Sequence, residues 1–158
     1  MTRETRRGYF EHDGLRLSYL DTAQPGPDGA PVLLALHGHL NEARFIEQGA
    51  IPDDLPYRVI ALDQRGHGES DHATSYRVED YVGDALALLD HLGVERAAVL
   101  GHSLGGVIAY SLAARAPDRV PALVVVDIGA DNHGDLSITR QWPRRAGGRE
   151  VLVEAFGF

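Results

Sequence analysis

Short apolar runs alternate along the chain with longer stretches in which apolar residues recur every three or four positions. The short runs predict buried strands, and the longer stretches predict amphipathic helices. Their alternation is typical of an α/β protein with a mostly parallel central sheet and helices on both faces. The expected strands cover residues 7–12, 15–21, 31–36, 58–62, 97–100 and 122–126, and the expected helices cover residues 41–49, 77–92 and 103–116.

Turn-forming residues separate these elements. Asp13 and Gly14 lie between the first two expected strands, where an Asp-Gly pair favours a tight hairpin. Gly93 follows the second expected helix and is a natural residue for its C-terminal end. After Ala130 the sequence becomes polar, rich in glycine and arginine, and without clear periodicity. This change marks the end of the recognisable α/β pattern.

The composition excludes several classes of function. The 158 residues carry a formal net charge of −8, which argues against nucleic acid and anionic membranes as partners. There is no cysteine and no lysine, so disulfides, thiolate metal sites, a cysteine nucleophile and Schiff-base chemistry are excluded. A membrane-spanning helix needs about 18 or more consecutive apolar residues, and no stretch of the sequence approaches that length. No signal peptide is visible either. We therefore expect a cytoplasmic protein.

The segment Gly101-His102-Ser103-Leu104-Gly105 fits the pattern G-x-S-x-G. It directly follows an expected strand and directly opens an expected helix, which is the setting of a nucleophile elbow. Such a turn is too tight for side chains at Gly101 and Gly105, and it exposes the serine hydroxyl at a helix N-terminus that favours negative charge. The alternative is a glycine-rich strand-to-helix turn with an incidental serine.

Two further segments follow the expected central strands. His37-Gly38-His39-Leu40 comes after the strand at 31–36, where enzymes with this elbow place a second oxyanion-hole donor. The backbone N–H groups of His39 and Leu104 are therefore expected to point at one carbonyl oxygen. Asp63-Gln-Arg-Gly-His-Gly-Glu-Ser70 comes after the strand at 58–62.

The segments LHGH, DQRGHGES and GHSLGG, in this order, resemble the esterase-like branch of the α/β-hydrolase fold family over residues 8 to about 130. The resemblance implies a partial core at residues 1–130 and the start of a cap or lid at residues 131–158. It also implies that the last strands and the catalytic histidine lie beyond Phe158. Haloalkane dehalogenases and epoxide hydrolases of this fold carry aspartate where Ser103 stands.

The remaining triad members are less clearly marked. In this fold the chain order is serine, then acid, then histidine. Asp127 ends an expected strand and is a candidate triad acid, with a loop-anchoring or helix-capping carboxylate as the alternative. His133 is the only histidine after Ser103, and a solvated loop histidine is the better interpretation of it. Asp63 and His67 are expected to hold the loop that contains them.

These observations predict a serine hydrolase that acts on a small-molecule ester-like substrate through an acyl-enzyme, with Ser103 as nucleophile and without metal or organic cofactor. A C–C bond hydrolase or a lactonase of the same fold is an alternative. So is a non-catalytic fragment or ligand-binding module, or a dimer that completes the sheet and the triad. Without a following strand, residues 123–126 would form an exposed apolar edge.

Overall fold

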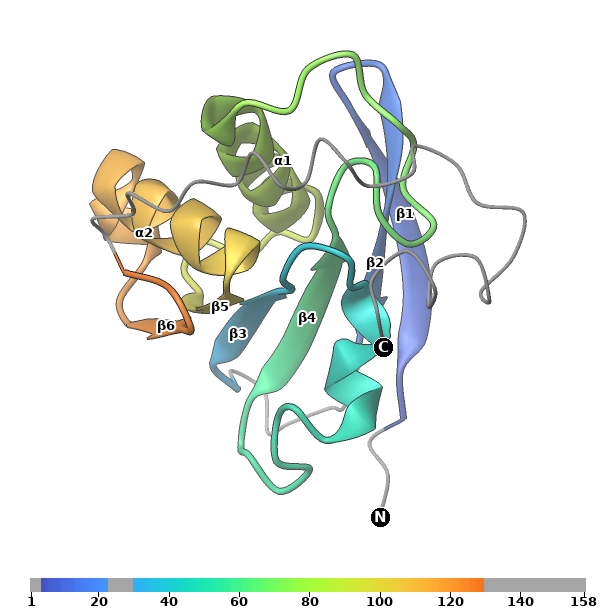
Figure 1. Cartoon of the computed structure of the whole chain (residues 1–158). Helices are drawn as coiled ribbons and strands as arrows, with labels where there is room; N and C mark the ends of the chain where they lie inside the picture. Colours follow the sequence, from blue (N-terminus) through green and yellow to red (C-terminus); the bar gives the residue numbers. More distant parts are fainter. Residues whose placement is uncertain (1–3, 23–29, 130–158) are drawn as a thin grey trace, which may run out of the picture.

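The computed structural model describes residues 4–22 and 30–129 (Figure 1). They form a six-stranded sheet with the strand order β1-β2-β4-β3-β5-β6. The strands are β1 (Arg6–His12), β2 (Leu15–Asp21), β3 (Val32–Leu36), β4 (Arg58–Asp63), β5 (Ala98–His102) and β6 (Leu123–Val126). The helices are α1 (Val78–His91), α2 (Leu104–Arg115) and the short 3-10 helices η1 (Ala43–Gln48) and η2 (Pro117–Arg119).

The pairing of the strands is mixed. β1 and β2 pair antiparallel, as do β2 and β4, whereas β4, β3, β5 and β6 run parallel to one another. Leu36 of β3 lies opposite Gly101 of β5, and His102 of β5 lies opposite Val126 of β6. The carboxyl ends of the parallel strands therefore meet at one edge, where open α/β sheets place their sites. The predicted fold class is confirmed.

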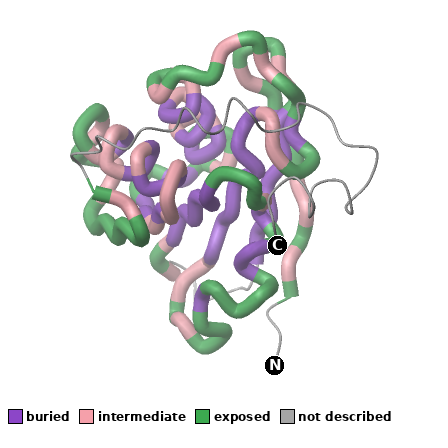
Figure 2. The backbone as a smooth tube through the Cα atoms, in the orientation of Figure 1, coloured by how far each residue is buried: buried purple, intermediate pink, exposed green. Residues whose placement is uncertain are grey.

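The sheet has a core on each face, because successive side chains of a strand point in opposite directions. Leu34 and Leu36 of β3 pack with α1 and α2 on one face, whereas Leu33 and Ala35 pack with η1 on the other. Buried backbone accordingly runs through the central strands and along α1 (Figure 2). No helix in the described part of the chain is long and apolar enough to cross a membrane.

The turn residues adopt the conformations that their sequence predicts. Asp13 and Gly14 have φ angles of 56° and 74°, and His12 pairs with Leu15 across a two-residue hairpin. Positive φ at both central positions is the type I′ turn that matches the twist of the strands. Gly93, just after α1, has a φ angle of 64°. The helix predicted at residues 41–49 is instead the 3-10 helix η1.

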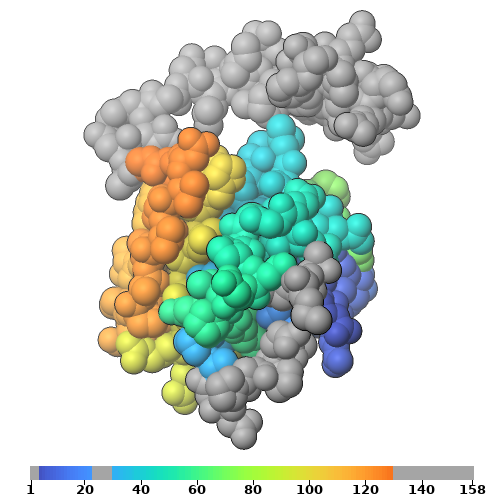
Figure 3. Space-filling view, turned by 90° about the horizontal axis from the view of Figure 1, so that it is seen from below, coloured from blue at the N-terminus to red at the C-terminus, as the bar shows by residue number. Residues whose placement is uncertain are grey.

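β6 differs from the prediction of a buried strand. All four of its residues are exposed, with fractions between 36% and 50%, because β6 lies at the edge of the sheet. Among the described residues only β5 pairs with it. β6 belongs to the orange part of the chain, which lies along one side of the space-filling view (Figure 3). Among the described residues, β6 is therefore the exposed apolar edge that was the alternative expectation for residues 123–126.

Candidate active site

Ser103 occupies the turn between β5 and α2. Its backbone has φ 49° and ψ −114°, a combination that non-glycine residues rarely adopt and that costs about 1–3 kcal/mol. Hydrogen bonds hold this conformation: the Ser103 N–H donates to the Val126 carbonyl at 2.9 Å, and the Ser103 carbonyl accepts from the Gly106 N–H at 2.8 Å. Strain of this kind collects at functional sites, where the surrounding structure enforces it.

The glycines on either side of Ser103 lie in close backbone contact. A Cβ atom at Gly101 would stand 2.1 Å from the Gly105 carbonyl oxygen, and one at Gly105 would stand 2.1 Å from the Leu36 carbonyl oxygen. Both neighbours are backbone atoms, so neither can rotate away. The turn thus packs α2 directly on β5 and β3, and only glycine fits at either position.

The loop after β3 lies against this turn. A Cβ atom at Gly38 would be 3.4 Å from the Cβ atom of Ser103, and the Gly105 N–H donates to the His37 carbonyl at 3.1 Å. Leu104 is the first residue of α2, and its N–H has no hydrogen-bond partner among the described residues. The structure therefore brings the segments of His39 and Leu104 to the same end of the sheet as Ser103.

His37 joins the ends of β3 and β4 in the interior. Its Nε2 lies 3.2 Å from the Gln64 N–H, which can only donate, so the ring proton sits on Nδ1 and is donated to the Gly38 carbonyl at 2.8 Å. Burial lowers the pKa of His37 to about 4. His37 is therefore neutral near pH 7, and it acts as a fixed hydrogen-bonding link beneath the loop.

Asp63 at the end of β4 holds two loops at once. Its buried carboxylate accepts from the Ala43 N–H at 2.6 Å and from the Glu69 N–H at 3.2 Å, and it also accepts from Ser18 and Arg7. Burial alone would raise the pKa of this carboxyl, but these hydrogen bonds outweigh it and lower the pKa below its ordinary value. As predicted, Asp63 fixes the loop after it, and it fixes the loop after β3 as well.

We expect Asp63→Asn to lower the free energy of unfolding by about 3–5 kcal/mol, because it breaks a buried charge pair and leaves its donors unsatisfied. Urea unfolding measures the loss, with Asp118→Asn on the exposed surface of η2 as the matched control. The folded pKa lies below the unfolded value of about 3.9. The contribution of Asp63 is therefore complete above that value and is lost as the pH falls below it. Equal stability of Asp63→Asn and wild type at pH 7 would contradict this assignment.

Asp127 directly follows β6, at the same edge of the sheet as Ser103. It has a φ angle of 59°, its side chain is 79% exposed, and its carboxylate lies 3.6 Å from Nε2 of His102. The contact is longer than a hydrogen bond and lies at the surface, so it contributes little to stability. The placement of Asp127 suits a triad acid, and its contact with His102 suits a loop anchor. Its role as triad acid stays a prediction.

Two histidines are engaged away from Ser103, which makes them poor candidates for the general base. His12 pairs with Asp84 at 2.8 Å, and the ring of His91 stacks on that of Phe10 at 5.7 Å. His133 and the expected cap at residues 131–158 lie outside the described residues. The described residues therefore bring the candidate nucleophile, the candidate oxyanion segments and Asp127 to one edge of the sheet.

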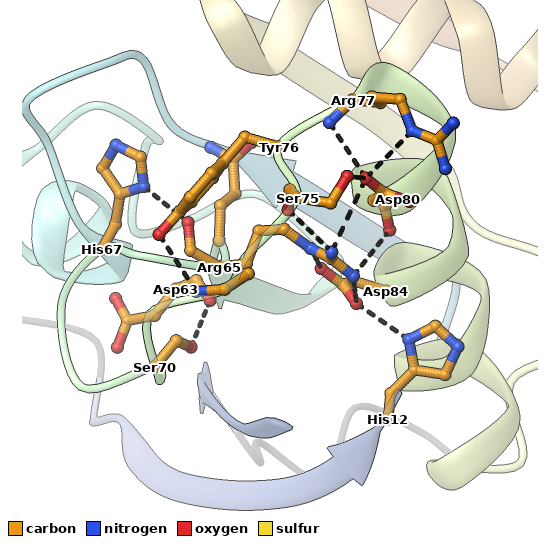
Figure 4. Close-up of polar contacts among 12 residues, drawn as sticks. His12, Asp63, Arg65, His67, Ser70, Ser75, Tyr76, Arg77, Asp80 and Asp84 are labelled. Atoms are coloured by element: carbon orange, nitrogen blue, oxygen red, sulfur yellow. Dashed lines mark hydrogen bonds and ion pairs between the residues drawn. The ribbon is translucent and has the colours of Figure 1, made fainter. Parts of the chain in front are cut away.

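Sequence reasoning missed a buried network behind the loop after β4 (Figure 4). Arg65 donates to both carboxylate oxygens of Asp84 in α1, at 2.6 and 2.8 Å, and also to the Ser75 carbonyl at 3.1 Å. His12 of β1 contacts the same carboxylate. The network anchors the loop to α1 and to the hairpin. Its only signal in the sequence is the arginine of DQRGHGES.

Comparison with known proteins places the chain in a family. Residues 31–149 match the alpha/beta hydrolase fold family. The chain is 35% identical over 121 residues to Epoxide hydrolase 4 of Mus musculus. The aligned region covers 75% of this chain and 33% of that protein. It is 39% identical over 103 residues to Lipase LipV of Mycobacterium tuberculosis. The aligned region covers 65% of this chain and 39% of that protein.

A solved structure agrees with this placement. The crystal structure of Epoxide Hydrolase A from Mycobacterium thermoresistibile superposes with a TM-score of 0.71 at 28% identity, covering 87% of this chain and 43% of that one. The chain spans 33% and 39% of the length of the two curated relatives named above. Their names describe two different reactions, so the likeness identifies the fold family and leaves the reaction open. The chain belongs to the α/β-hydrolase fold family.

Proposed function

We propose that this chain supplies the nucleophile and the oxyanion hole of a serine hydrolase that cleaves an ester-like bond through an acyl-enzyme. The observation that carries the proposal is the strained backbone of Ser103, held between β5 and α2 by glycines that no other residue can replace. A protein that only binds a ligand gains nothing from such a turn, whereas a nucleophile needs its hydroxyl exposed at the end of the sheet.

The identity of residue 103 separates this chain from the epoxide hydrolases that it resembles in sequence. Epoxide hydrolases of this fold carry aspartate at the nucleophile position, and this chain carries serine. A serine hydroxyl, once its proton is removed, attacks an acyl carbonyl and forms an ester intermediate. The likeness to a relative named as a lipase supports the same chemistry.

In the proposed reaction Ser103 Oγ attacks the acyl carbonyl, and a histidine outside the described residues takes its proton. The N–H groups of His39 and Leu104 stabilise the negative charge on the carbonyl oxygen. Asp127 orients the histidine, which then protonates the leaving group, and water releases the acid from the acyl-enzyme. The mechanism requires neither a metal nor an organic cofactor. His133 and a histidine beyond Phe158 are the two positions open for the base.

The test is covalent labelling of the serine by a fluorophosphonate, read by intact mass and peptide mapping. Both the 158-residue chain and the longest gene product that contains it are treated. We expect a single adduct on Ser103 in the longer product, unchanged in Ser111→Ala on α2 and absent in Ser103→Ala. An adduct in the short chain would point to His133 or to a second copy of the chain as the source of the base. No adduct on Ser103 in either polypeptide would contradict the proposal and favour a ligand-binding module.

A further inference from the structure

Three imidazole rings stand in a row beside the elbow. The ring centroid of His67 lies 5.1 Å from that of His37 and 5.5 Å from that of His39, with interplanar angles of 60° and 74°. Aromatic rings prefer such tilted and edge-to-face arrangements. His37 follows β3 in the interior, His39 lies in the exposed turn at 38–41, and His67 belongs to the loop after β4. The row therefore connects that turn to the ends of two central strands.

His67 is itself firmly held by its own loop. Its backbone N–H donates to the Gln64 carbonyl at 2.9 Å, and its Nδ1 donates to the Arg65 carbonyl at 3.1 Å (Figure 4). The next residue, Gly68, has a φ angle of 53°, and a Cβ atom there would stand 2.3 Å from the Asp63 carboxylate. The loop is thus closely packed around Asp63. His67 presents a fixed surface to its neighbours.

The turn on the other side of the row is exposed and strained. The Asn41 N–H donates to the Gly38 carbonyl at 3.3 Å, near the long end of hydrogen-bond geometry, and Leu40 has a φ angle of 63° with 66% of its surface exposed. An oxyanion donor must be aimed before the reaction, because reorienting it in the transition state costs free energy. A turn of this kind therefore benefits from a rigid neighbour.

We propose that His67 is a positioning residue, whose ring supports the turn at 38–41 and so aims the His39 N–H at the oxyanion. The inference rests on the proposed function, because it gives that turn a part in the reaction. His67 touches no reacting atom in this proposal. It acts only through its contact with His39, and it is backed by the buried ring of His37.

The electrostatics of the row favour neutral rings. Burial lowers the pKa of His39, and a positive charge on His67 lowers it further. Burial likewise lowers the pKa of His37; charge on His67 and His39 also opposes protonation there, whereas Asp63 favours it. Three neighbouring cations would repel one another, whereas three neutral rings pack favourably. His37 and His39 therefore favour the neutral form in which they pack against the ring of His67.

The test compares His67→Ala, His67→Phe and the control His72→Ala, an exposed histidine of the same loop. The longest gene product that contains the chain is used. Hydrogen exchange of the peptide covering residues 37–43 reports the turn directly, with the strand at 58–63 as internal reference. Hydrolysis of p-nitrophenyl butyrate gives kcat and KM separately.

We expect His67→Ala to speed exchange at 37–43 by about fivefold, the scale of one lost ring contact, and to leave the reference strand unchanged. Its kcat should fall about tenfold or more at nearly unchanged KM, because a misaimed donor weakens only the transition state. His67→Phe, which keeps a ring, should restore both values, and the control should match wild type.

Unchanged exchange at 37–43 in His67→Ala would overturn the inference, and so would faster exchange with wild-type kcat. If wild type hydrolyses no ester, the proposed function fails on its own. In that case faster exchange in the alanine variant and its reversal by phenylalanine would still support His67 as the support of the turn. If wild type hydrolyses the ester but exchange at 37–43 is unchanged in His67→Ala, the proposed function stands and the role of His67 is refuted.

Discussion

Replacing Ser103 by alanine is expected to lower kcat for p-nitrophenyl butyrate by about six orders of magnitude, the loss seen when a nucleophile that works as a unit with its base is removed. The measurement is steady-state hydrolysis by the longest gene product that contains the chain, with Ser111→Ala as control. The oxyanion hole remains in the alanine variant, so a small rate above the uncatalysed reaction should persist.

The outcome in the 158-residue chain sharpens this prediction. We expect serine-dependent turnover only in the longer product, because His133, which follows Ser103 in this chain, is better interpreted as a solvated loop histidine than as the base. Serine-dependent turnover by the short chain would point to His133 or to a second copy as the source of the base. Turnover that survives Ser103→Ala at more than about a tenth of the wild-type rate would show that another group is the nucleophile.

The second large effect concerns Asp127. Asp127→Asn should lower kcat by about four orders of magnitude, because an amide in place of the orienting carboxylate favours the wrong tautomer of the histidine. The Asp127 side chain is 79% exposed. The unfolding midpoint of the Asp127→Asn variant should therefore equal that of wild type and that of the control Asp118→Asn. The comparison therefore separates catalysis from stability.

A different result for Asp127 would be equally informative. A fall in kcat of less than about tenfold would remove Asp127 from the triad, since loss of the orienting acid of such a unit costs about four orders of magnitude. Its contact with His102, 3.6 Å away, would then be its main one, and it would serve as a loop anchor. The triad acid would have to come from another part of the protein.

The sequence predicted the strands well, because apolar runs bounded by turn residues leave few alternatives. The hairpin at Asp13 and Gly14 and the helix α1 follow from local preferences that the fold does not override. Two predictions were less accurate. The expected helix at 41–49 is too short to be sustained and forms a 3-10 helix. The burial of β6 depended on a neighbouring strand, and an apolar run alone cannot show whether one is present.

The candidate site was predictable only where neighbouring residues in the sequence determine its geometry. The turn at Ser103 is encoded locally, since the close packing of α2 against the sheet requires glycine at positions 101 and 105. The link between His12 and Asp84 joins residues 72 positions apart, and no spacing rule reveals it. The row of His37, His67 and His39 likewise depends on how two separate loops fold around Asp63.

The hydrogen bond from the Ser103 N–H to the Val126 carbonyl has a consequence for how reactivity arises during folding. It ties the strained serine to β6, an edge strand of the described sheet, and edge strands fray most readily. When β6 separates from β5, nothing on that side holds the serine in its costly conformation, and its backbone relaxes. In the proposed function Ser103 can therefore be acylated only once β6 has paired with β5, so a nascent or misfolded copy carries an ordinary, unreactive serine.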